Sequence, residues 1–218
     1  MIKPVFVSLV WVATLAAVGR ADDGNLLANG GFETAARLAP PRLEWLRKSG
    51  VTFDGDDPLL PVRWTINARN AHLALAPDAH GGRQALHGVC TNGNASAEMG
   101  VIEVVPGAAY TFGAWSKGAG AGRLTIWGNA YEGRKELAWT DLPFSNAWTE
   151  ARGRVTIPGN IRTVTVALAL RNSRDAQVDD VFFAAESATP FDADAVLNEK
   201  YKTDAHTLAL VDFDGQGV

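Results

Sequence analysis

The strongest constraint on the fold is a repeated pattern of short apolar or alternating runs between Arg63 and Glu186. These runs are rich in Val, Ile, Thr and aromatic residues, and turn pairs such as PG, KG and EG separate them. Such a pattern is typical of an antiparallel β-sandwich, and no alternation of strands with helices interrupts it. We therefore predict an all-β sandwich of the jelly-roll type over residues 22–186.

Two segments depart from this pattern. The stretch PRLEWLRKSG has proline at its start and glycine at its end, which predicts a short helix over residues 41–49. We place this helix in an insertion, residues 35–62, at the edge of the sandwich. The last segment, residues 187–218, begins with the linker-like SATP and ends on the strand-like LALVDF. It is predicted to be either an added edge strand or the start of a truncated further module.

The N-terminus carries the marks of a signal peptide over residues 1–21. A basic tip, MIK, precedes an apolar run that is shorter than the roughly twenty residues needed to span a bilayer. We expect a secreted or surface-located chain, with an uncleaved anchor as the alternative. The net charge of −4 argues against a nucleic-acid partner. Cys90 is the only cysteine, so the chain cannot form an internal disulfide.

A series of short motifs resembles the carbohydrate-binding modules of families 4, 9 and 22. In order, the motifs are NLLANGGFE, Trp64, HGGRQALHG, VVPGAAYTFGAWSKG, Trp148 with Thr149, VTIPG and VDDVFF. The resemblance covers about Asn25 to Ala185 and implies a galactose-binding-like jelly roll that binds polysaccharide without catalysis. The insertion departs from the family, in which the first tryptophan closely follows the FE motif.

The resemblance also implies a structural Ca²⁺ that joins the first and last parts of the domain. Carried over by position, its ligands are Glu33, Asp180 or Asp179, and backbone oxygens around Gly81 and Gly82. Carboxylate and carbonyl oxygens are the ligands that Ca²⁺ prefers. The alternative is that these carboxylates bond only backbone amides. We also interpret NLLANGGFE as a strand with a bulge, anchored in the core by its leucines and phenylalanine.

Flat aromatic rings stack on the apolar faces of sugars, so exposed tryptophans are the candidate ligand contacts. In RLTIWGNAY, the alternation of a strand places Trp127, Asn129 and Tyr131 on the face opposite Leu124 and Ile126. We predict the first three as glycan contacts. Trp115 and Trp139 are further candidates, and Trp115 would flank a groove with Trp127 if their strands are neighbours. Trp64 and Trp148 are assigned to the core.

Three functions remain open. The first is a secreted, non-catalytic domain that targets a protein to polysaccharide, as an accessory domain of a glycoside hydrolase does. The second is a spacer or adhesion domain that kept the fold and lost the sugar site. The third is a glycan-acting hydrolase, which needs two carboxyl groups about 5 to 10 Å apart. The acids considered for that pair are Glu98, Glu103, Glu132 and Glu136.

Overall fold

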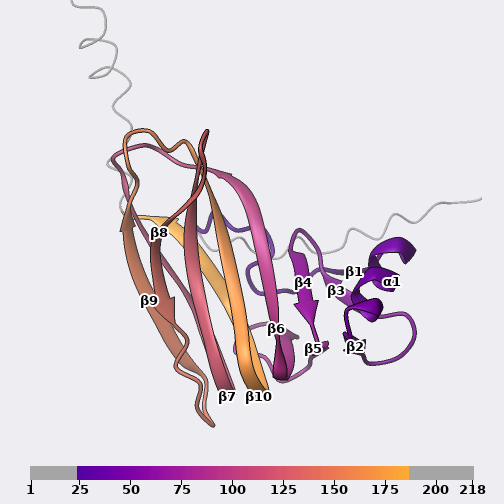
Figure 1. The fold of residues 1–218 in the computed structure, drawn as a ribbon. Helices are drawn as coiled ribbons and strands as arrows, with labels where there is room; N and C mark the ends of the chain where they lie inside the picture. The colour runs from indigo at the N-terminus through magenta and orange to yellow at the C-terminus, as the bar shows by residue number, and fades with distance from the viewer. Residues whose placement is uncertain (1–23, 187–218) are drawn as a thin grey trace, which may run out of the picture. The chain divides into compact units, whose positions relative to one another are not determined.

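The computed structural model describes residues 24–186, which form a β-sandwich (Figure 1). The predicted signal peptide, residues 1–21, and the predicted C-terminal segment, residues 187–218, lie outside the described residues. In the described part of the chain, no helix is long and apolar enough to span a membrane. The elements are β1 (Ala35–Arg37), α1 (Pro40–Lys48), β2 (Thr52–Phe53), β3 (Leu59–Pro61), β4 (Thr65–Arg69), β5 (His72–Ala76), β6 (Ala85–Glu103), β7 (Ala109–Ala130), β8 (Gly133–Asp141), β9 (Thr149–Thr156) and β10 (Thr163–Ala185).

Three long strands, β6, β7 and β10, run through both layers of the sandwich. The first half of β10 pairs with the second half of β6 on one side and with the second half of β7 on the other. Strand β4 flanks β6, and β8 flanks β7. We call this layer, in the order β4-β6-β10-β7-β8, the front sheet. The other halves of the long strands form the back sheet, in the order β2-β5-β6-β10-β7-β9. All pairs are antiparallel except β2 with β5.

Each long strand passes from one sheet to the other at a bend. In β7 the bend lies in the run KGAGAG, where Gly118 has a φ of +104° and a side chain at Gly120 would collide with Ser173. In β10 the pairing register shifts on both sides of Ser173, and Asn172 has a φ of +48°. Such shifts are β-bulges, which bend a strand and increase its twist.

The core lies between the two sheets and follows the alternation predicted from the sequence. Phe112 of the back sheet and Leu124 and Ile126 of the front sheet are fully buried. The strand β10 contributes to the core from both sheets, with Val166 in the first half and Phe183 in the second. This arrangement confirms the predicted all-β jelly-roll class. Trp64 is buried as predicted, whereas Trp148 is only half-buried.

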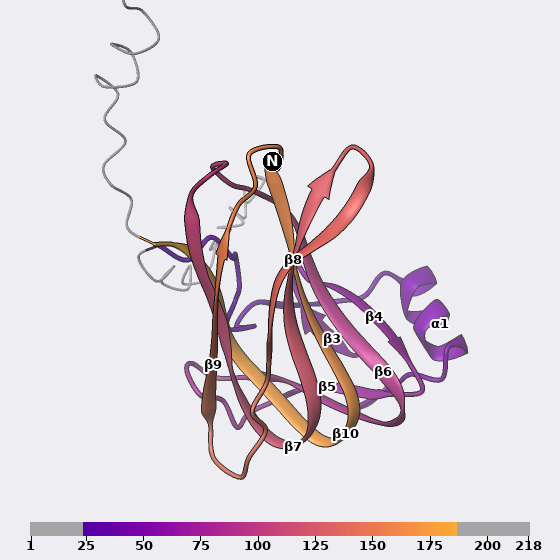
Figure 2. The same cartoon turned by 60° about the vertical axis from the view of Figure 1, so that its left-hand side comes forward.

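The insertion forms a small structure of its own beside β4, as Figure 2 shows for α1. Strand β1 pairs with β3, and α1 agrees with the predicted helix to within a residue at its ends. Proline opens the helix, where its missing N–H costs nothing, and Leu46 is its buried contact with the core. Without an acidic first turn or a side-chain cap, α1 depends on these tertiary contacts for its stability.

The motif NLLANGGFE is a tight turn, so its interpretation as a strand is wrong. Only Asn25 forms an isolated bridge, with Ala184, and the following residues are turns. Asn29 lies at a φ of +66°, and its side-chain amide bonds backbone groups of Thr34 and Val62. A side chain at Gly30 would come within 2.0 Å of the carbonyl oxygen of Val181, so glycine is required there.

The core contacts predicted for this motif are correct for two of its three apolar residues. Leu27 and Phe32 are buried, and the Phe32 ring packs on Trp64 with centroids 5.3 Å apart. Leu26 is 44% exposed. Leu26 and Leu27 are adjacent and point in different directions, so only Leu27 enters the core.

Candidate functional site

The outer face of the front sheet is polar at its edges and lined by small side chains in the middle. One row of cross-strand neighbours runs Asn67, Ser96, Ala169, Arg123 across four adjacent strands. Ser96 and Ala169 project little, so the row has a low centre between two longer side chains. Neighbouring strands are about 4.8 Å apart, which makes the row roughly 14 Å wide.

A groove of about 330 Å³ lies over this face, above β4, β6 and β10. Its floor includes Ser96 and Ala169, and polar side chains surround it. The lining residues are Trp45, Asn67, Ala68, Arg69, Asn94, Ala95, Ser96, Ala169, Leu170 and Arg171. The groove therefore combines one flat aromatic ring with amide, hydroxyl and guanidinium groups, which is the mixture that a sugar ring requires.

Trp45 belongs to α1 and was not among the candidates predicted from the sequence. Its ring is 47% exposed, and the guanidinium of Arg42 lies 4.3 Å from the ring centroid. Arg42 also donates hydrogen bonds to the carbonyl oxygen of Ile66 and to Oδ1 of Asn67, the latter at 2.7 Å. Arg42 therefore holds the indole at the β4 edge, and the insertion builds a wall of the groove instead of covering it.

Trp139, a predicted contact, lies on β8 beyond the opposite side of the row. Its ring is 47% exposed, and the Arg123 guanidinium lies 4.0 Å from its centroid. Arg123 in turn donates to Oδ1 of Asp141 at 3.2 Å. The front sheet thus presents an exposed tryptophan on each side of its small-residue centre, each stacked with an arginine.

The three glycan contacts predicted in RLTIWGNAY differ in side-chain exposure and in hydrogen bonding. Trp127 faces outward as expected but is half-buried, opposite Thr165 on β10. The Asn129 amide is engaged with the hydroxyls of Thr163 and Thr165, each at 3.3 Å. Tyr131 is fully exposed in the turn between β7 and β8, beyond the last cross-strand pair.

The expectation that Trp115 and Trp127 flank one groove is wrong. Both lie on β7, but the bend of the strand puts Trp115 in the back sheet, opposite Glu150 of β9, and Trp127 in the front sheet. The Trp115 ring is stacked on His80, with centroids 3.7 Å apart and planes 11° apart. Trp115 therefore belongs to a packed contact of the back sheet.

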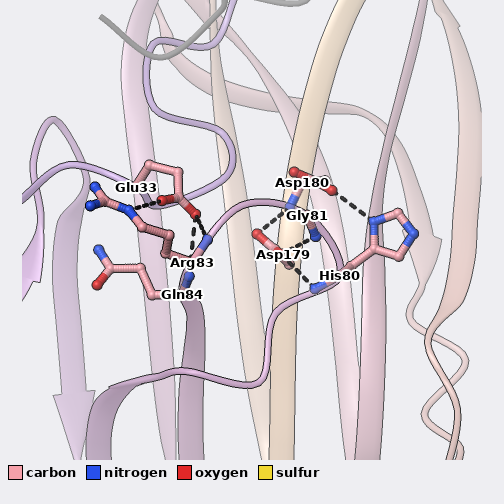
Figure 3. A network of polar contacts seen from close by, with 7 residues as sticks. All are labelled: Glu33, His80, Gly81, Arg83, Gln84, Asp179 and Asp180. Atoms are coloured by element: carbon pink, nitrogen blue, oxygen red, sulfur yellow. Dashed lines mark hydrogen bonds and ion pairs between the residues drawn. The ribbon is translucent and has the colours of Figure 1, made fainter. Parts of the chain in front are cut away.

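The predicted metal ligands gather around the loop of residues 77–84 (Figure 3). On one side, Oε1 of Glu33 accepts hydrogen bonds from the backbone N–H groups of Arg83 at 2.7 Å and Gln84 at 3.2 Å. A side chain on Gly82, whose φ is +70°, would come within 2.2 Å of the same oxygen. The glycine thus lets the carboxylate approach the loop backbone.

On the other side of the loop lie Asp179 and Asp180, whose carboxylates both lie near Gly31 and His80. Asp179 is fully buried and accepts hydrogen bonds from the N–H groups of His80, Gly81 and Asp180 at 2.8 to 3.0 Å. Asp180 is half-buried, and its Oδ2 lies 2.7 Å from Nδ1 of His80. Burial raises the pKa of Asp179 to about 6, although the hydrogen bond from Gly81 acts in the opposite direction.

The three carboxylates differ in how many oxygens remain available to coordinate calcium. The oxygens of Asp179 are used by backbone donors, so this residue acts as a hydrogen-bonded clamp. Oε2 of Glu33 has only a 3.5 Å contact with the Arg83 side chain. Oδ1 of Asp180 faces Gly31, where a Cβ would lie 3.1 Å away. Glu33 and Asp180 therefore retain oxygens that fit a hard cation, and calcium binding stays a prediction.

Two carboxylates of the front sheet, Glu98 and Asp141, are paired with arginines. Glu98, considered for a hydrolytic pair, forms an ion pair with Arg134 of β8 at 2.8 Å. Because β10 and β7 lie between β6 and β8, this pair reaches across the sheet and indicates that its outer face is hollowed. Glu136 lies opposite Trp127 and has no ion pair among the described residues.

Neither a protein-family model nor a curated protein sequence matches this chain. Solved structures do match it. The enzymatically active domain of bacteriophage CBA120 tailspike protein 4 has a TM-score of 0.54 and 13% identity over 74% of this chain. This chain spans 21% of that domain.

Carbohydrate-binding modules are also among the matching structures. A family 61 module in complex with β-1,4-galactotriose covers 74% of this chain and 99% of its own length, at 15% identity and a TM-score of 0.46. The family 22 xylan-binding domain of Paenibacillus barcinonensis Xyn10C covers 57% and 86%, at 12% identity and a TM-score of 0.42. At these identities the likeness concerns the fold alone, and modules of the kind that the sequence resembles are among the matching structures.

Proposed function

We propose that this chain is a non-catalytic glycan-binding domain whose binding site is the groove of the front sheet. The observation that carries the proposal is the pair of exposed tryptophans, Trp45 and Trp139, on either side of a floor of small side chains. Indole faces stack on the C–H faces of pyranose rings, and the surrounding amides and guanidinium groups match their hydroxyls.

The rings are also preorganised, which favours binding. Arg42 and Arg123 each stack on one tryptophan and are themselves held by polar partners, Asn67 and Asp141. Fixing a flat ring before the ligand arrives reduces the entropy lost on binding. A spacer domain has no need of two exposed, braced indoles on one hollowed face, so the glycan-binding function is favoured over that alternative.

The test is affinity electrophoresis of the chain, lacking residues 1–21, in gels that contain soluble polysaccharides. Trp45→Ala and Trp139→Ala are each expected to weaken binding about tenfold or more, because the stacking surface is lost. Trp115→Phe is the matched control, since Trp115 lies in the back sheet against His80. Equal retardation of all three variants and the unaltered chain would contradict the proposal.

We also propose that Glu33 and Asp180 are ligands of a structural Ca²⁺ ion. Both residues join the N-terminal turn and the last strand to the same loop, so a cation there would stabilise the folded state by mass action. We expect the melting temperature to rise when Ca²⁺ is added after chelation, and Glu33→Gln to reduce that rise. An unchanged melting temperature at millimolar Ca²⁺ would eliminate this ligand.

Secretion is the remaining part of the proposal, and it rests on the sequence of residues 1–21. A secreted domain of this kind would hold a protein, or an enzyme of which it is an accessory domain, near a polysaccharide. Expression with the native leader, followed by N-terminal sequencing of the extracellular product, is expected to find a start near Asp22. Retention of the full-length chain in the membrane fraction would instead support the uncleaved anchor.

A further inference from the structure

The groove carries positive charge at one end that no carboxylate neutralises. Arg69 of β4 and Arg171 of β10 both line the groove, and both are exposed. Neither forms an ion pair among the described residues, and no aspartate or glutamate lines the groove. The chain as a whole is acidic, with a net charge of −4, so this local excess of arginine is not a consequence of composition.

The two arginines lie on one row of the front sheet. Each is the cross-strand neighbour of Asn94, from opposite sides, so their backbones are about 10 Å apart. Side chains as long as arginine can converge over Asn94 from that separation. Together with the Asn94 amide they form a set of N–H donors in the groove that Trp45 also lines.

Elsewhere on this face, two arginines are already paired with carboxylates. Arg123 pairs with Asp141 at 3.2 Å, and Arg134 pairs with Glu98 at 2.8 Å. Internal pairing leaves those guanidinium groups little capacity for an anionic ligand. The contrast identifies Arg69 and Arg171 as the cationic groups that are free to meet a charge brought by a ligand.

We propose that the groove selects an acidic glycan, one whose sugar rings carry carboxylate groups as hexuronates do. This inference rests on the proposed function, because it assigns the chemical class of the ligand of the same groove. The planar guanidinium group binds a carboxylate through two parallel N–H···O bonds, which neutral hydroxyls cannot reproduce. The sugar ring then stacks on Trp45 while its carboxylate reaches Arg69 and Arg171.

The test compares acidic polysaccharides with their carboxyl-reduced forms, which keep the backbone and lose the charge. Polygalacturonate and glucuronoxylan serve as the acidic probes, in affinity electrophoresis at low ionic strength. At least one acidic form is expected to bind about tenfold or more tightly than its reduced form, because charged hydrogen bonds are lost on reduction. The difference is expected to shrink as salt is added, since screening weakens exposed charge pairs.

Variants assign the preference to the two arginines. The double variant Arg69→Gln with Arg171→Gln is expected to bind acidic and reduced forms equally, with an unchanged melting temperature. Arg162→Gln removes an exposed arginine that does not line the groove, and it is expected to keep the acidic preference. Trp45→Ala is expected to weaken binding of both forms.

Four outcomes decide the matter. Equal binding of acidic and reduced forms by the unaltered chain would overturn the acidic preference and leave the glycan-binding function standing. Persistence of the preference in the double variant would overturn the role of Arg69 and Arg171. Binding of dextran sulfate but of neither uronate would also overturn it, in favour of sulfate. Binding of no form of any polysaccharide would overturn the proposed function itself.

Discussion

At the scale of single residues, the most unusual group is the buried carboxyl of Asp179. Three backbone N–H groups surround it, yet burial in the core dominates and raises its pKa to about 6. In calcium-free protein, we expect the side-chain carbonyl ¹³C resonance of Asp179 to titrate with a midpoint near pH 6. A midpoint at or below the ordinary value of 3.8 would show that the hydrogen bonds outweigh burial.

The sign of the effect on stability follows from this shift. A carboxyl whose pKa is higher in the folded state binds its proton more tightly there, so folding is disfavoured once the proton is lost. The contribution of Asp179 to the free energy of unfolding therefore falls as the pH rises from about 4 to about 6. The loss is about 2 to 3 kcal/mol and is complete above the folded pKa.

Gly82 illustrates a second requirement at this scale. Its φ of +70° and its closeness to Glu33 both exclude a side chain. Gly82→Ala is expected to lower the free energy of unfolding by about 1 to 3 kcal/mol in denaturant titrations. Gly159→Ala is the control, because nothing lies within 4 Å of its added Cβ, and it should change stability by about 0.5 kcal/mol or less. Equal stability of the two variants would contradict the requirement for glycine where Glu33 approaches the loop.

At the scale of elements, the position of α1 beside β4 depends on the contacts of one residue, Arg42. Arg42 connects the helix to β4 and stacks on Trp45. Arg42→Ala is expected to speed amide hydrogen exchange over residues 40–48 and to weaken glycan binding although Trp45 remains. Lys48→Ala removes only an exposed pair with Glu44 and should leave both properties unchanged. Normal exchange in Arg42→Ala would show that Leu46 alone anchors the helix.

The strands show how much of the fold the sequence predicts. Alternation in RLTIWGNAY correctly placed Leu124 and Ile126 in the core and Trp127 outside it. The alternation of side chains does not reveal where a strand bends, however. It therefore could not show that Trp115 and Trp127, both on the continuous strand β7, lie in different sheets. The glycines of KGAGAG mark the bend, but only the pairing with β8 and β9 reveals that the strand changes sheets.

The groove was predicted in part for a related reason. The sequence predicts Trp139 as a candidate contact. It does not predict Trp45, because the helix that carries Trp45 is assigned to an insertion at the edge of the sandwich. Where a helix lies depends on long-range contacts, here those of Arg42 with Ile66 and Asn67. The carboxylates around residues 77–84 were found by position because motifs at both ends of the domain meet there.

At the scale of the whole molecule, the described residues separate stability from recognition. The Asn25 side chain joins the N-terminal turn to β10 through hydrogen bonds with Val181 and Phe183. Asp179 of β10 bonds the backbone of residues 80 and 81 in the loop before β6, and these contacts together act as a clamp. The proposed glycan groove lies apart from this clamp, on the front sheet over β4, β6 and β10, with Trp45 among its lining residues. Loss of the clamp should therefore lower stability, whereas loss of either indole should lower affinity.

An NMR titration of the ¹⁵N-labelled chain with an oligosaccharide of the polymer it binds best locates the glycan site residue by residue. We predict that the largest shifts occur at the amides of Ser96 and Ala169 and at the indole N–H groups of Trp45 and Trp139. Shifts confined to the back sheet, with Trp115 moving and the groove residues unchanged, would contradict the claim that the front groove is the glycan site.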